Sequence, residues 1–177
     1  MDYDSNVCYG YDYYRLVSAS DIGEDPDLTS IPWTTFFTAT LPGGLLENCV
    51  LAPVTSVEDL NEIAAAAGLE EFTFVGIRKP ANDVVGKAAS DVGWKNLDDT
   101  DVPDTGNQIW ENSQPNNDNG QGAEIYAVFR SVKGKLAVGK LYDVPNYTPP
   151  SKDFVLNKAV MKCCAKGYIP KTFCSAA

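Results

Sequence analysis

The residues whose types and spacing favour a specific chemistry lie in one polar run, Trp110-Glu111-Asn112-Ser113-Gln114-Pro115-Asn116-Asn117. In this run Pro115 is flanked by two side-chain amides, those of Gln114 and Asn116. The bond before a proline is the only kind of peptide bond that adopts the cis form readily. A cis bond before Pro115 would place both amide oxygens on one side of the loop.

Two carboxylates complete this set of oxygen donors. Glu124 follows Gln114 by ten residues, and Asp143 comes later in a predicted turn. Amide and carboxylate oxygens are the ligands that calcium prefers in proteins. The pattern therefore predicts a calcium site, and the competing interpretation is a cluster of polar turns, because the run is rich in turn-forming asparagine.

The composition argues against several classes of function. The chain has 177 residues, 14 Lys and Arg against 24 Asp and Glu, a net charge of −10 and no histidine. The acidic balance argues against a nucleic-acid partner. The lack of histidine excludes Ser-His-Asp and Cys-His catalysis and the usual zinc sites. No apolar run reaches the ~18 residues of a membrane-spanning helix.

The five cysteines, whose spacing matches neither CxxC nor a metal motif, are Cys8, Cys49, Cys163, Cys164 and Cys174. They favour an oxidising compartment, and hence a secreted or extracellular protein, with two disulfides and one thiol left over. Buried reduced thiols are the alternative. Spacing does not determine which cysteines pair.

The elements that must position these residues follow from apolar periodicity. A helix should begin at a capping box formed by Thr55 and Glu58 and end at Gly68. The segment 31–40 is a short helix with Pro32 in its first turn, or a strand. Strands are predicted at 9–18, 50–54, 72–77, 125–129, 135–141 and 154–162.

Between 79 and 122 the chain is rich in Pro, Gly, Asn and Asp, and loops of this length are usually functional. Helices come early and strands late, which is typical of an α+β fold. We expect a single domain over 1–177, with a core at about 8–164 and a C-terminal extension over 165–177.

Several motifs, taken in chain order, resemble those of C-type lectin-like domains. Trp110 followed by Gln114-Pro115-Asn116 resembles the family signature W-x-x-G-[EQ]-P-[ND], with Ser113 in place of the usual glycine. The other matching segments are Leu51-Ala52-Pro53-Val54 with Glu58, Phe74-Val75-Gly76-Ile77, Gly122-Ala123-Glu124 and Leu141-Tyr142-Asp143, the last resembling the family's W-N-D. The resemblance covers roughly residues 8–164.

This resemblance implies a fold with two helices, antiparallel strands and a long irregular loop. It also implies a site shared by calcium and a sugar, with Gln114, Asn116, Glu124 and Asp143 as the metal ligands and the same residues with Tyr142 as the carbohydrate contacts. Tyr142 stands in the usual asparagine position, and a neutral phenol is a poor calcium ligand. We therefore expect weak calcium affinity.

The family's disulfide pattern is only partly present. Its members usually carry two bridges, and Tyr126 stands where one end of the second bridge would lie, with no cysteine between Cys49 and Cys163. The resemblance implies that Cys49 substitutes in the first bridge, with Cys163 or Cys164 as its partner. Cys8 would then pair with Cys174 or with the other of the two adjacent cysteines.

The function expected from the resemblance is an extracellular, calcium-dependent carbohydrate-binding module whose partner is a glycan or glycoprotein. The alternative is a calcium-independent domain of the same type that recognises a protein or other ligand in adhesion or defence. A glycosidase using Glu124 and Asp143 is a third hypothesis, but no spacing specifies their separation, and we predict no enzyme. The sugar and the oligomeric state stay open.

Overall fold

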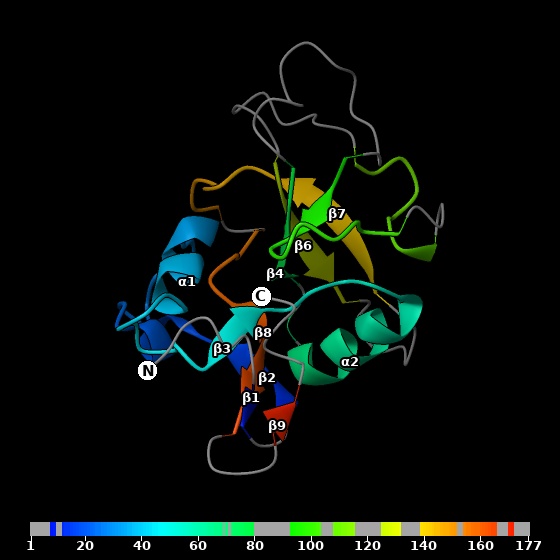
Figure 1. The fold of residues 1–177 in the computed structure, drawn as a ribbon. Coiled ribbons are helices and arrows are strands. Elements are labelled where there is room, and N and C mark those ends of the chain that lie inside the picture. Colours follow the sequence, from blue (N-terminus) through cyan, green and yellow to red (C-terminus); the bar gives the residue numbers. More distant parts are fainter. Residues whose placement is uncertain are drawn as a thin grey trace.

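Two α-helices and a mixed β-sheet form the fold (Figure 1). The computed structural model describes residues 8–9, 12–68, 70, 72–79, 93–103, 108–115, 125–131, 139–151, 154–165 and 170–171. The helices are η1 (Ala19–Ile22, a 3-10 helix), α1 (Trp33–Ala39) and α2 (Val57–Ala67). The strands are β1 (Cys8–Tyr9), β2 (Asp12–Val17), β3 (Cys49–Leu51), β4 (Phe72–Arg78), β5 (Lys95–Asn96), β6 (Tyr126–Arg130), β7 (Lys140–Val144), β8 (Ala159–Cys164) and β9 (Pro170–Lys171). The predicted α+β class is confirmed.

The main sheet has the strand order β2-β8-β4-β6-β7, with β3 also paired to β8 and β5 to β4. These pairs are antiparallel except β4 and β8, which meet in parallel where Phe74 lies opposite Ala159. A separate antiparallel pair, β1 and β9, holds residues 8–9 beside residues 170–171. The sheet is therefore mixed rather than purely antiparallel.

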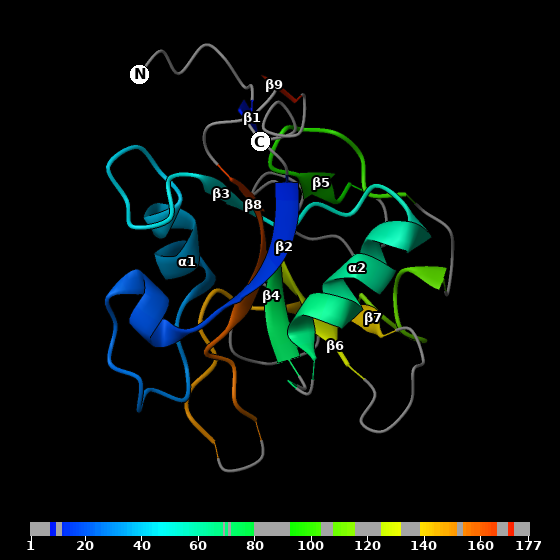
Figure 2. The same cartoon turned by 90° about the horizontal axis from the view of Figure 1, so that it is seen from below.

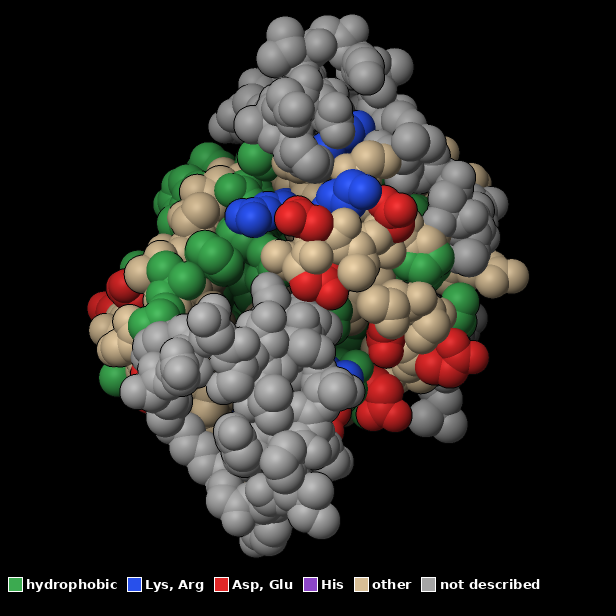
Figure 3. Space-filling model, viewed as in Figure 1, with side chains coloured by type: hydrophobic (Ala, Val, Ile, Leu, Met, Phe, Trp, Pro, Cys, Tyr) green, Lys and Arg blue, Asp and Glu red, His purple; other side chains and the backbone are tan. Residues whose placement is uncertain are grey.

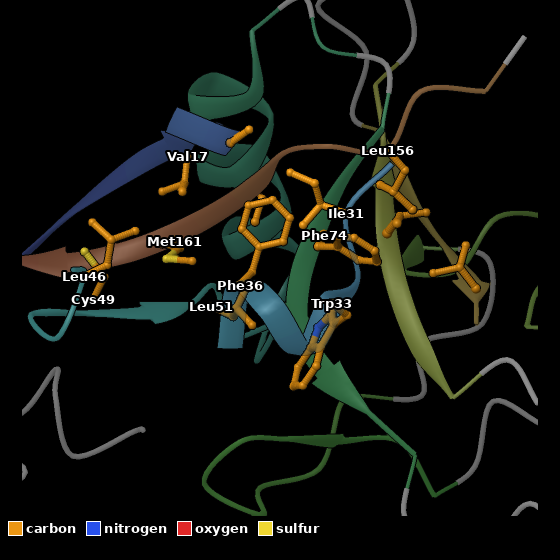
Figure 4. Packing of buried hydrophobic residues seen from close by; sticks show 14 of the residues in the cluster. Val17, Ile31, Trp33, Phe36, Leu46, Cys49, Leu51, Phe74, Leu156 and Met161 are labelled. Atoms are coloured by element: carbon orange, nitrogen blue, oxygen red, sulfur yellow. The ribbon is translucent and has the colours of Figure 1, made fainter. Parts of the chain in front are cut away.

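The sheet lies between the two α-helices (Figures 1 and 2), and strand alternation divides its side chains between them. In β4, Phe74 faces α1 while Val75 and Ile77 face α2. We call the first cluster the α1-side core, which includes Trp33 and Phe36 (Figure 4), and the second the α2-side core. The largest aromatic side chains of the α2-side core are Trp94, Trp110 and Phe129.

Gly76 allows the chain after β3 to pass directly over β4. A Cβ at this position would lie 2.2 Å from the carbonyl oxygen of Leu51. The Gly76 N–H donates to the Ala52 carbonyl at 2.8 Å. A side chain here would separate the two segments, which is why glycine occupies this position.

Helix α2 confirms the predicted helix, but its cap is shifted by one residue. The N-cap is Ser56, whose Oγ accepts from the Asp59 N–H at 3.3 Å. The Asp59 carboxylate accepts in turn from the Thr55 N–H at 2.7 Å. The expected Thr55–Glu58 capping box is therefore wrong, whereas Gly68 ends the helix as predicted, with a φ of 60°.

The segment 31–40, for which a short helix and a strand were both open, forms helix α1. The cap of this helix comes from a distant part of the chain. The N-cap residue is Pro32, which has no side-chain acceptor. Asn146 supplies one, because its Oδ1 accepts from the Thr34 N–H at 3.0 Å and its Nδ2 donates to Thr34 Oγ1 at 3.1 Å. The segment after β7 thus fixes the start of α1.

The strand predictions are confirmed in kind but not at every boundary. Strands β4 and β6 lie within one residue of their predicted ranges, and the predicted strand 9–18 is divided into β1 and β2. Strand β7 begins at Lys140 rather than 135, and residues 132–138 lie outside the described part of the chain. Strand β8 begins at Ala159 rather than 154 because Leu156 forms an isolated parallel bridge with Ser30 instead.

A disulfide joins β3 to β8 through Cys49 and Cys163, which are also opposite each other in the strand register. Cys164 is disulfide-bonded as well. The prediction that Cys49 bonds one of the two adjacent cysteines is confirmed. Reduced thiols are excluded for these three residues.

Candidate functional site

The polar run singled out in the sequence begins on an extension of the sheet edge at β7. Trp110 is buried and forms a parallel bridge with Leu141. The Leu141 N–H donates to the Ile109 carbonyl at 2.9 Å, and the Glu111 N–H donates to the Leu141 carbonyl at 3.1 Å. These bonds fix the start of the run beside β7, two residues before Asp143.

A tight turn follows this pairing. The Gln114 N–H donates to the Glu111 carbonyl at 2.9 Å, and the bond between Gln114 and Pro115 is cis. Ser113 has a φ of 68°, in the left-handed region that favours glycine. This is the position at which the resembling signature has glycine.

The structure describes three of the five predicted site residues. Gln114 is half-buried in the turn, and Tyr142 and Asp143 are consecutive residues of β7. Asn116 and Glu124 lie outside the described residues.

Tyr142 and Asp143 lie on opposite faces of the sheet, because successive side chains of a strand alternate. Tyr142 packs against the α1-side core. Asp143 is opposite Ala127 of the α2-side core in the strand register and is only 5% exposed. The structure therefore does not bring these two predicted sugar contacts together on one face.

The Tyr142 side chain takes part in a cation–aromatic cluster instead. Arg130 Nη1 lies 3.3 Å from the Tyr142 hydroxyl, to which it donates. The Arg130 guanidinium carbon lies 5.6 Å from the centroid of the Tyr142 ring and 5.4 Å from that of Phe72. A positive charge next to the phenol makes this hydroxyl an unsuitable ligand for a second cation.

The donor set for a metal is incomplete in the described part of the chain. Within it, no group of three Cys, Asp or Glu side chains is arranged to hold a metal ion. Gln114 and Asp143 are the described members of the expected calcium set, and both supply oxygen. These two are compatible in type with calcium, which takes oxygen ligands.

An aromatic stack that sequence reasoning missed lies at the same end of the sheet, on the α1 side. Trp33 stacks on Tyr126, with ring centroids 4.4 Å apart, and on Phe37 at 5.3 Å. The guanidinium carbon of Arg78 lies 5.8 Å from the Phe37 centroid. The helical spacing of Trp33 and Phe37 is visible in the sequence, but their contact with β4 and β6 has no sequence signal.

A groove of about 620 Å³ lies between α2 and β2. Within it the Tyr14 hydroxyl donates to Asp59 Oδ1 at 3.5 Å, and Lys162 Nζ lies 5.3 Å from the centroid of the Tyr14 ring and 3.6 Å from Asp12 Oδ2. Burial raises the pKa of Tyr14 strongly, and the carboxylates of Asp59 and Glu62 raise it further. The phenol thus stays protonated, and the groove already contains a cation paired with one of its acids.

No protein-family model matches this chain, and no curated protein matches it either. Among the described residues, no helix is both long and apolar enough to cross a lipid bilayer. The sequence motif that the observed geometry supports most directly is the turn at Gln114, because backbone hydrogen bonds pair the residues just before it with β7.

Proposed function

We propose that the protein is an extracellular carbohydrate-binding module of the C-type lectin-like kind, which binds glycans through its long loop without transforming them. The observation that carries this proposal is the backbone pairing of Ile109 and Glu111 with Leu141. That pairing places the turn holding Gln114 at the same sheet edge as Asp143. A motif turn and a carboxylate-bearing strand are thereby fixed side by side.

Other features support the resemblance in fold. Two helices flank the sheet, and the disulfide between Cys49 and Cys163 joins β3, which comes early in the chain, to β8, which comes late. Trp94 packs against Trp110 with ring centroids 4.9 Å apart, which gives the long loop an aromatic base. Each feature is one that we expect of a domain whose long loop is anchored to its sheet.

We further propose that calcium occupies this site, held by Gln114, Asn116, Glu124 and Asp143. When bound, calcium would accept the hydroxyl oxygens of a sugar as additional ligands, since it takes 6–8 oxygens. The chain's own part is to orient the Gln114 amide and the Asp143 carboxylate. Tyr142 is left out of the site because its hydroxyl accepts from Arg130 on the other face.

The direct test is a glycan array probed with the purified protein in millimolar calcium and again in EDTA. We expect binding that EDTA removes and that Asp143→Asn weakens strongly, because the substitution takes away a charged ligand. Glycan binding that persists in EDTA would contradict the calcium mechanism. A failure of any glycan to bind would contradict the carbohydrate function.

A second candidate is calcium-independent recognition of a protein ligand by the same fold. The observation that favours it is the engagement of Tyr142, which removes one oxygen donor from the expected site. This candidate predicts no change in melting temperature when calcium is added. A calcium-dependent rise in melting temperature would exclude it.

A further inference from the structure

Arg78 lies at the end of the sheet from which the long loop leaves. It is the last residue of β4, its side chain is exposed, and it is opposite Tyr126 of β6 in the strand register. Tyr126 is in turn opposite Val144 of β7, next to Asp143. Arg78 therefore lies at the same end of the sheet as the proposed glycan site, but on the α1 side.

The charge environment of Arg78 is unusual for so acidic a chain. Arg15, Lys95, Lys158 and Lys162 each pair with a carboxylate. Within the described residues, Arg78 has no carboxylate partner. It is instead directly opposite Lys95, which contacts Asp101.

One aromatic ring, that of Phe37, lies against the Arg78 guanidinium. Phe37, which lies beneath it, stacks on Trp33 with an interplanar angle of 13°. The Trp33 indole N–H donates to the Val75 carbonyl at 2.9 Å, which fixes the stack to β4. A guanidinium has its N–H donors in its own plane, so a ring against its face leaves those donors to a planar acceptor such as a carboxylate.

We call this site the Arg78 shelf: it consists of the exposed Arg78 and the half-buried Phe37 and Tyr126, with Trp33 buried beneath them. In Figure 3, Lys and Arg side chains, with Asp and Glu side chains directly next to them, lie beside the apolar side chains that cover α1, just below the grey region at the top of that view. The charge of the whole chain is −10, but the Debye length is about 8 Å at physiological salt. A single oxyanion at the shelf is therefore attracted by Arg78, whereas a long polyanion is repelled by the rest of the chain.

We infer that the Arg78 shelf binds the carboxylate or sulfate group of an acidic saccharide. This inference deepens the proposed function, and its saccharide part depends on that function. The shared chemistry is an oxyanion that accepts two parallel hydrogen bonds from one guanidinium. The long-loop site would take the sugar hydroxyls, and the shelf would select saccharides that carry a charged group.

The test uses a glycan array with neutral, carboxylated and sulfated versions of each sugar, together with calorimetric titration of sodium sulfate as a sugar-free probe. The proteins are the wild type, Arg78→Gln and the matched control Lys140→Gln. Lys140 also has no carboxylate partner within the described residues and lies at the start of β7. Both substitutions change the net charge equally, and circular dichroism melts confirm folding.

We expect the wild type and Lys140→Gln to prefer acidic over neutral sugars by at least roughly tenfold, the size of one of the two charge-assisted hydrogen bonds. Arg78→Gln should remove this preference and keep the binding of neutral sugars. An unchanged preference in Arg78→Gln, or an equal loss in Lys140→Gln, overturns the inference while leaving the carbohydrate function standing. Binding of sulfate that depends on Arg78, without binding of any sugar, upholds the oxyanion site and overturns the carbohydrate function.

Discussion

The two faces of the sheet at its long-loop end differ in charge and in how their polar groups are satisfied. The α2 face holds the buried Asp143 carboxylate, and the α1 face presents the exposed Arg78 guanidinium above an aromatic stack. Consecutive residues such as Tyr142 and Asp143 are divided between these faces by strand alternation. A motif that is continuous in the sequence can thus contribute to two separate surfaces.

The buried tryptophans of the two faces also differ, in the hydrogen bonding of their indole N–H groups. Trp33 on the α1 side is 1% exposed, and its indole N–H is bonded to the Val75 carbonyl. Trp110 on the α2 side is 2% exposed, and its indole N–H has no hydrogen-bond partner within the part of the chain that the structure describes. The α1 face is therefore fixed by a specific polar contact, whereas the base of the long loop is held by packing alone at this residue.

The largest expected effect concerns the disulfide on the α1 side. Replacing both Cys49 and Cys163 by alanine should lower the free energy of unfolding by about 2–5 kcal/mol, because the bridge closes a long loop of the unfolded chain. Chemical denaturation of the double variant and the wild type measures this difference. An unchanged denaturation midpoint would show that the bridge does not stabilise this face.

The next effect compares the two tryptophans directly. Trp33→Phe and Trp110→Phe remove the same volume, but only the first leaves a buried carbonyl, that of Val75, without its donor. We therefore expect Trp33→Phe to cost about 1–3 kcal/mol more stability than Trp110→Phe. Urea denaturation of both variants tests this, and equal losses would contradict the difference between the faces.

A smaller effect is expected at Tyr142. Tyr142→Phe removes the hydroxyl that accepts from Arg130 and keeps the ring, so it should cost about 0.5–1.5 kcal/mol of stability. Because this hydroxyl lies on the face opposite Asp143, any calcium-induced shift in melting temperature should be the same as in the wild type. Loss of that shift in Tyr142→Phe would place the tyrosine in the metal site after all.

The smallest effect concerns the exposed cations. Arg78→Gln and Lys140→Gln should each change the free energy of unfolding by no more than about 0.5 kcal/mol, as is usual for surface substitutions. Both should lie on the stabilising side, since Arg78 is opposite Lys95 and Lys140 is opposite Arg130 in the strand register. Thermal denaturation at low salt measures both, and a large loss in Arg78→Gln would show that its contact with Phe37 is structural.

Much of the fold could be predicted because local patterns and tertiary structure agree. The apolar spacing of Leu60, Ile63 and Ala67 predicts the buried face of α2, and these residues are buried. The start of α1 could not be predicted in detail, because its cap comes from Asn146, more than a hundred positions away. Adjacent polar residues such as Thr55 and Ser56 compete for the same capping role, so the pattern alone does not choose between them.

The site was predictable in part for similar reasons. The spacing around Gln114 identifies the turn, but its position beside β7 depends on long-range hydrogen bonds to Leu141. The separation of Tyr142 from Asp143 follows from strand periodicity, so the sequence did contain a signal against placing both in one site. The contact of Arg78 with Phe37 depends on how α1 packs on the sheet, and no local pattern encodes it.

The central claim is that calcium binds at the long-loop edge through Asp143, and calorimetric titration of calcium tests it most directly. The proteins are the wild type, Asp143→Asn and the matched control Asp101→Asn, whose side chain is 79% exposed beside Lys95. We predict one weak site in the wild type and in Asp101→Asn, and none in Asp143→Asn. Equal calcium binding by all three proteins, or by none, would contradict the claim.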